Sequence, residues 1–329
     1  LPVAIVLLFA PLGLGPMELL KSPKAWGVAA AVGGCIGGCI RVLRHLQDVP
    51  LPKKNEAERT QKIVDFFMND LRTTYTFDQL ISGLTMEVAP DGSICGSITV
   101  TGQMLSKEQV LHEGALMCII DDLTSMAVWA KALWAGVTVE MSCTALVPVR
   151  VGEKLAVKAR CLRVGSTMAF TSFEMRRADE GGEVLAVGAQ TKHIGQPLQT
   201  RLTLSLANRH VPLAMWMYEK GKRRSNATLA KLVAEGKMKP LQKIGESATM
   251  EETLALQPVP GGEGGGRFWT FVQLHLMNAY WGGHGASSAG LFATAVREYL
   301  RGTGIDGAQV RVSEMRCSYL MPVPCFCPV

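Results

Sequence analysis

The sequence predicts an α+β fold in which one long, buried helix is wrapped by antiparallel strands. Residues 112–129 are apolar on nearly every helical face, which is typical of a helix inside a core rather than on a surface. The chain has 329 residues, 48% of them hydrophobic, and is long enough for about two domains with sizeable cores. Strand-like runs precede and follow the helix, at 83–88, 93–102, 137–147, 154–164, 166–177 and 184–193.

The first 50 residues are predicted to be a hydrophobic helical anchor or a segment that docks on a partner. Residues 25–40 are apolar, lie between Lys24 and Arg41, and contain Gly-xxx-Gly spacings that suit close helix–helix contact in lipid. A signal or transit peptide is the alternative interpretation. We therefore expect residues 1–45 to contact a membrane or a membrane-protein complex. A mitochondrial location, at the inner membrane, is the corresponding expectation.

Three further segments are predicted to follow this N-terminal part. Residues 51–197 form a first α+β domain, which begins with an amphipathic helix over 56–71. Residues 198–262 form a helical insertion that ends in a Gly-rich linker. Residues 263–329 form a second, partial domain.

Charge and cysteine usage exclude several classes of function. The net charge of +6 is modest, and its one dense run, residues 220–224, is interpreted as a solvated helix end, so no nucleic-acid partner is expected. The nine cysteines are scattered and never form Cys-x-x-Cys. We therefore expect neither a disulfide framework nor a metal or other cofactor site.

The second, partial domain repeats part of the first. Residues 314–323 match residues 140–149 at six of ten positions. A His-x-x-x helix start also recurs, at His112 and at His284, with an offset of 172 residues against 174 for the strands. This pattern indicates tandem duplication of one supersecondary unit, of which the second copy is incomplete.

The first copy resembles a known family through motifs that occur in order. These are His112-x-Gly114, Asp121 nine residues later, and the runs 136–141, 165–172 and 191–193. Together they look like the hotdog-fold acyl-CoA thioesterases of the phenylacetate-degradation type, over roughly residues 80 to 195. The resemblance implies a hotdog fold, with a long helix wrapped by antiparallel sheet, and hydrolysis of an acyl-CoA thioester as substrate.

The resemblance also implies a composite site between two hotdogs. One copy would contribute the acid Asp121 and the hydroxyl of Thr138, in place of the usual Ser. The other copy would contribute the remaining matches to the family site, Asn278, His284 and Gly285. The start of that second helix would stabilise an oxyanion while Asp121 acts as general base or nucleophile.

The mirrored site is predicted to be inactive. Ala293 stands at its acid position, Ser106 where the Asn belongs, and Glu113 where the family has its first Gly. A negative charge at the last position opposes binding of an oxyanion.

Other interpretations of the same residues remain open. Asp121 is alternatively a satisfied core carboxylate, and His112 and His284 are alternatively caps of backbone N–H groups. At the level of the whole chain, the alternatives are a catalytically inactive hotdog that serves as an accessory subunit of a large membrane assembly, and an acyl-CoA-binding protein without turnover.

Overall fold

The structure, a computed structural model, is described here for part of the chain. Compact division of the chain gives two units, residues 1–51 and 52–329, and all described residues lie in the second. The described residues are 56–71, 77–132, 134–179, 182–196, 249–254, 256–258, 268–269, 284–305, 312–319 and scattered positions between 216 and 235.

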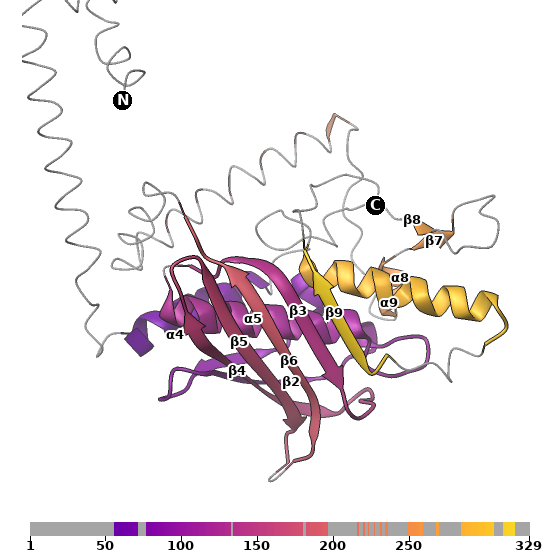
Figure 1. Ribbon diagram of the computed structural model, residues 1–329, viewed down its shortest axis with the longest axis horizontal. Helices are drawn as coiled ribbons and strands as arrows, with labels where there is room; N and C mark the ends of the chain where they lie inside the picture. Colours follow the sequence, from indigo (N-terminus) through magenta and orange to yellow (C-terminus); the bar gives the residue numbers. More distant parts are fainter. Residues whose placement is uncertain are drawn as a thin grey trace, which may run out of the picture. The chain divides into compact units, whose positions relative to one another are not determined.

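A single long helix, α5 (Glu113–Lys131), lies against a seven-stranded antiparallel sheet and contacts five of its strands (Figure 1). The strand order is β1-β2-β4-β5-β6-β3-β9. The strands are β1 (Thr85–Val88), β2 (Ile94–Thr99), β3 (Val137–Ala145), β4 (Lys154–Val164), β5 (Met168–Arg177), β6 (Val184–His193) and β9 (Glu314–Ser318). Shorter helices are α4 (Glu56–Leu71), η3 (Phe77–Ile81), η4 (Gly102–Met104) and α8 (Met250–Leu254), and β7 (Gln257–Pro258) pairs with β8 (Phe268–Trp269).

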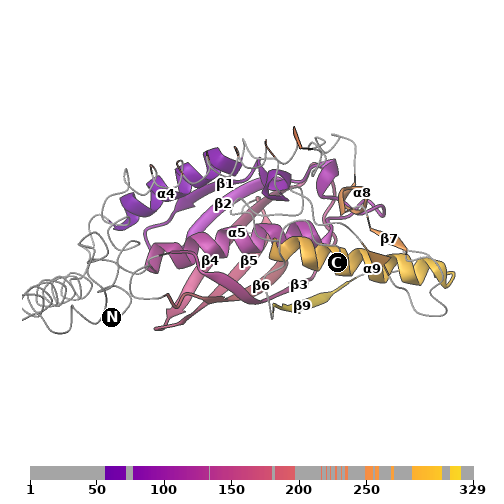
Figure 2. The same ribbon diagram turned by 90° about the horizontal axis from the view of Figure 1, so that it is seen from above.

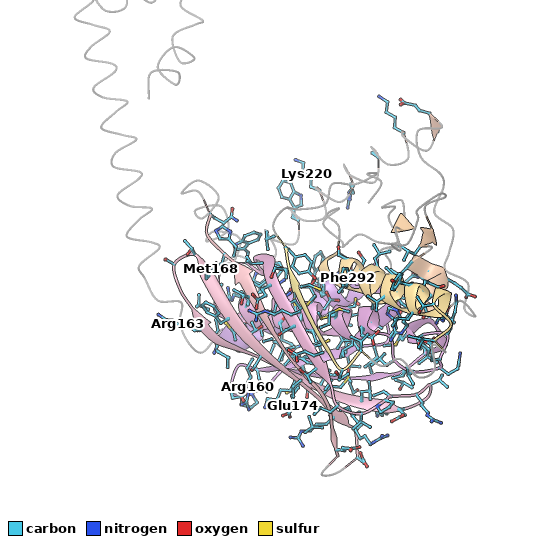
Figure 3. The ribbon with its side chains drawn as sticks, turned by 45° about the vertical axis from the view of Figure 1, so that its right-hand side comes forward. Arg160, Arg163, Met168, Glu174, Lys220 and Phe292 are labelled. Carbon is cyan, nitrogen blue, oxygen red and sulfur yellow. The ribbon has the colours of Figure 1, made fainter. Side chains whose placement is uncertain are left out.

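The predicted α+β architecture is confirmed, and its helix is buried as the apolar pattern indicated. Residues of α5 from every helical face are buried, including Ala115, Ile119 and Leu123. The strands on the far side of the first copy alternate as expected for a sheet with one face on the core. Figure 3 shows the side chains of Arg160 and Glu174 on strands β4 and β5, and these residues belong to the less buried positions of that alternation.

Residues from the end of the chain extend this domain on two levels. Strand β9 pairs with β3 along its outer edge, from Glu140 opposite Ser318 to Thr144 opposite Glu314. Helix α9 (Gly285–Gly302) packs on α5, as Figures 1 and 2 both show. The pairing is centred on Ser142 and Arg316, which face each other, so the two matching strand segments meet in a symmetric register.

Contacts between the two helices follow the same symmetry. Nε2 of His112 lies 3.1 Å from Oγ1 of Thr294, and Nε2 of His284 lies 4.0 Å from Oδ1 of Asp122. Since 112 + 172 = 284 and 122 + 172 = 294, these two contacts join equivalent positions of the repeat. The N-terminal halves of α5 and α9 therefore lie side by side and antiparallel.

Glycines allow the two helices to approach closely, and this gives a stability prediction. A Cβ added to Gly114 would lie 2.9 Å from the Cα of Gly290, so the backbones must separate to accept it. We expect Gly114→Ala to lower the free energy of unfolding by about 1–3 kcal/mol, although Gly→Ala usually stabilises a helix. Gly302→Ala, on the same α9 with nothing within 4 Å, is the control and should leave stability unchanged or slightly raised. A thermal melt of both variants checks this, and equal melting temperatures would contradict it.

Some predicted segments lie outside the described residues. They include the N-terminal anchor, most of the insertion at 198–262 and the expected strand after 267, of which only Phe268–Trp269 is described. Within the described part of the chain, no helix is both long and apolar enough to cross a membrane. The proposed domain limits and the membrane location therefore stay predictions.

Candidate functional site

Asp121 lies at the centre of a buried polar cluster between α5 and the sheet. Its Oδ1 accepts hydrogen bonds from Nε2 of Gln190 at 2.6 Å and from Nζ of Lys192 at 2.8 Å. The hydroxyl of Thr138 donates to the same oxygen at 3.3 Å and accepts from both Gln190 and Lys192, at 2.9 and 3.1 Å. The hydrogen-bonding capacity of the Thr138 hydroxyl is therefore filled, and the cluster fixes one face of the carboxylate.

The second oxygen of Asp121 faces α9. Oδ2 lies 3.5 Å from Nδ1 of His284, the residue that caps the start of this helix. The side chain of Asp121 is 12% exposed, whereas that of His284 is 1% exposed. The structure thus brings together three of the residues predicted for the site, Asp121, Thr138 and His284, although they come from two regions more than 140 residues apart.

Charge decides the protonation of this cluster. Burial opposes ionisation of Asp121, but Lys192 and His284 outweigh it and hold the pKa of this carboxyl far below its usual range. Asp121 is therefore an anion at neutral pH. For Asp122, burial and the neighbouring charge of Asp78 raise the pKa well above that of an ordinary aspartate. Adjacent carboxyls on one helix thus have opposite protonation.

His284 binds on both sides of its ring. Nε2 lies 2.8 Å from Oδ1 of Asp78, and Nδ1 accepts from the backbone N–H of Ala286 at 3.1 Å. Burial lowers the pKa of His284, but the charges of Asp78, Asp121 and Asp122 outweigh it and raise the pKa to about 9. A neutral ring caps the helix through Nδ1, whereas a protonated ring turns Nδ1–H into a donor toward Asp121.

The other two predicted site residues have different outcomes. Gly285 begins α9 directly after His284, and its carbonyl accepts a hydrogen bond from Oη of Tyr319 at 2.7 Å. Tyr319 follows β9, so the strand and the helix of the second copy are joined next to Asp121. Asn278 lies outside the described residues.

The mirrored position, at the start of α5, has a different composition. His112 caps α5 by accepting from the N–H of Gly114 at 2.9 Å, and burial followed by the charge of Arg297 lowers its pKa well below the usual value. Its ring is therefore neutral. The carboxylate of Glu113 forms an ion pair with Arg297 at 2.7 Å, and both side chains are buried. An arginine thus takes the space beside Glu113, one turn away from the buried Ala293.

Sequence reasoning missed three residues of the Asp121 cluster, namely Gln190, Lys192 and Asp78. One signal was present, because Gln190 and Lys192 alternate along β6 on the face that points to the core, and a lysine on such a face is unusual. Asp78 gave no comparable signal, since it meets His284 across 206 residues.

Comparisons with known proteins agree on one family. Residues 108–194 match the thioesterase superfamily. Acyl-coenzyme A thioesterase 13 of Mus musculus is 32% identical over 121 residues, which cover 36% of this chain and 85% of that protein. Its counterpart in Homo sapiens is 29% identical over 120 residues, with the same coverage.

Solved structures give the same name. The zebrafish thioesterase superfamily member 2 aligns with a TM-score of 0.38 and 25% identity, over 40% of this chain and 96% of that one. Because a relative at 32% identity is matched over 85% of its length, and because a long helix lies on an antiparallel sheet, the family and the fold are established. The chain is a member of the thioesterase superfamily and contains its hotdog domain.

Proposed function

We propose that this protein hydrolyses acyl-CoA thioesters at one composite site, where Asp121 and Thr138 of the first hotdog face the start of α9. In this proposal residues 284–319 belong to a second, incomplete hotdog that completes the site of the first. One observation carries the proposal: the ionised Asp121, hydrogen-bonded by Thr138, lies 3.5 Å from the residue that caps α9. The sequence relatives named acyl-coenzyme A thioesterase support the substrate class.

The division of labour between the two Asp121 oxygens suggests the mechanism. Oδ1 already accepts from Gln190, Lys192 and Thr138, so Oδ2 is the oxygen left to accept a proton from water. The water oxygen then forms a bond to the thioester carbonyl carbon, and the carbonyl oxygen gains negative charge. Collapse of this intermediate breaks the carbon–sulfur bond, and the leaving CoA thiolate takes up the proton from Asp121.

The start of α9 would stabilise the charge on that carbonyl oxygen. The N-terminus of an 18-residue helix carries partial positive charge and N–H groups that point along its axis. Removal of one such preorganised donor typically reduces turnover by about 10²–10³-fold. The mirrored position offers an anion, Glu113, at the equivalent place, so we propose one working site per chain rather than two.

Thr138 provides the test that disturbs the fold least. We expect wild-type protein to release CoA from short-, medium- or long-chain acyl-CoA, and Thr138→Val to lower kcat/KM by about 10- to 100-fold, the range for a hydrogen bond to a charged group. Thr144→Val, on the same strand β3 and outside the Asp121 cluster, is the control and should match wild type. Free CoA is measured by chromatography, because Cys95 and Cys317 are partly accessible thiols that would react with a thiol reagent.

The same assay separates the alternatives. Binding of acyl-CoA without release of CoA would favour the binding protein without turnover. Neither binding nor release would overturn the proposal and leave the inactive accessory subunit. Membrane association through residues 1–45 and a mitochondrial location remain part of the proposal that the sequence alone supports.

A further inference from the structure

Four side chains with metal-binding atoms meet on the Nε2 side of His284. Asp78 comes from η3, Cys118 and Asp122 come from α5, and His284 begins α9. One atom each from Asp78, Cys118 and His284 lie within 4.8 Å of one another. Asp122 is four residues after Cys118, and therefore on the same face of α5, with Oδ1 at 4.0 Å from Nε2 of His284.

The distances suit a small tetrahedral ion. Bonds of about 2.0–2.3 Å to zinc place neighbouring ligand atoms roughly 3.3–3.8 Å apart. Sγ of Cys118 lies 3.8 Å from Nε2 of His284, and the Asp122 oxygen lies 4.0 Å from it. Asp78 is closer, at 2.8 Å, so its carboxylate would move away from the ring by about half an ångström to share an ion instead of a proton.

Charge and hydrogen bonding also point to a cation here. Three aspartates gather around this buried region, Asp78, Asp121 and Asp122, and Lys192 is already bound to Asp121. Asp122 is 5% exposed, yet its Oδ2 has no hydrogen-bond partner among the described residues. A buried carboxyl oxygen without a partner is costly, and a cation between these side chains would satisfy it.

We propose that Asp78, Cys118, Asp122 and His284 bind one zinc ion, which ties η3, α5 and the start of α9 together. Thiolate, imidazole and carboxylate are the ligands that zinc takes in proteins, and four protein ligands without an open position are typical of a structural site. Binding displaces protons from the thiol of Cys118 and from the carboxyl of Asp122, so zinc replaces them in the buried cluster.

The bound ion would also orient His284 toward the Asp121 carboxylate. With zinc on Nε2, the ring proton lies on Nδ1, which is 3.5 Å from Oδ2 of Asp121. A metal-bound histidine commonly donates its other N–H to a carboxylate in this way. The start of α9 then exchanges one cap hydrogen bond, from Ala286 to Nδ1, for the link through the metal. This site is separate from the proposed hydrolysis, since it needs neither substrate nor turnover.

Metal content of the full chain tests the proposal. Protein produced in zinc-supplemented medium and desalted without chelator should carry about one zinc per chain by elemental analysis. Cys118→Ala and Asp78→Asn should each lose most of it, whereas Cys143→Ala, a buried cysteine of β3 away from the cluster, should keep it.

A second measurement decides the question even if the Cys118 variant does not fold. X-ray absorption of the wild-type zinc should show one sulfur and three nitrogen or oxygen neighbours. Zinc-free wild-type protein, a zinc shell without sulfur, or a folded Cys118→Ala variant with wild-type zinc content would each overturn the proposal. Because no substrate is present in either measurement, the result does not depend on whether the protein hydrolyses acyl-CoA.

Discussion

Asp121→Asn is expected to abolish acyl-CoA hydrolysis, with a loss of about 10²–10⁴ in turnover, because an amide cannot accept the proton of the attacking water. The substitution also leaves the ammonium of Lys192, whose side chain is 5% exposed, without its carboxylate. An unpaired buried charge costs about 3–5 kcal/mol, so the single variant should also be less stable. Free CoA release and a thermal melt are measured on the same preparations.

A double variant separates the two effects. Asp121→Asn combined with Lys192→Met removes both charges, so most of the stability should return while turnover stays lost. Asp65→Asn, at an exposed position on α4, is the control for the change of acid to amide and should behave as wild type. Recovery of activity in the double variant would mean that Asp121 is a structural ion-pair partner and not the base.

Arg297→Met is expected to give the largest loss of stability among single changes away from the site. Arg297 is 1% exposed and pairs with Glu113 at 2.7 Å and with Glu108 at 3.8 Å. Its removal leaves buried carboxylates without a counter-ion, at a cost of about 3–5 kcal/mol. The melting temperature should therefore fall by several degrees, since about 1 kcal/mol corresponds to roughly 2–4 °C in a domain of this size.

Two further variants check the cause of that loss. Arg297→Met with Glu113→Gln removes one charge of each sign and should recover a large part of the stability. Arg316→Met breaks an ion pair with Glu140 in which the arginine side chain is 67% exposed, and should change stability by less than about 1 kcal/mol. Equal losses in Arg297→Met and Arg316→Met would contradict the assignment.

Periodicity predicted the elements of the first copy well. Helix 56–71 and strands 154–164 and 184–193 have the predicted bounds, because alternation and apolar runs report local burial directly. The two-residue shifts at other strand ends, such as 168 for the predicted 166, fall in turns where both patterns stop. The proximity of Asp121 to Thr138 was also predictable, since the resemblance carried both residues.

Contacts between distant segments were less accessible to sequence reasoning. The repeat at 314–323 predicted a strand, but not that β9 would pair with β3. Lys192 joined the Asp121 cluster because of the register of β6, and a slip of one residue would have turned it away from the core. The cysteines showed no ligand spacing, yet the packing of α9 on α5 brings His284 to 3.8 Å from Cys118.

The pairing of β9 with β3 has a consequence for assembly and kinetics. Since the outer edge of β3 and the adjoining surface of α5 are taken by segments of the same polypeptide, a second copy of the protein cannot add through them. Both halves of the proposed centre are covalently linked, so dilution cannot separate them. Specific activity should therefore stay constant over any range of protein concentration, whatever oligomer the remaining surfaces form.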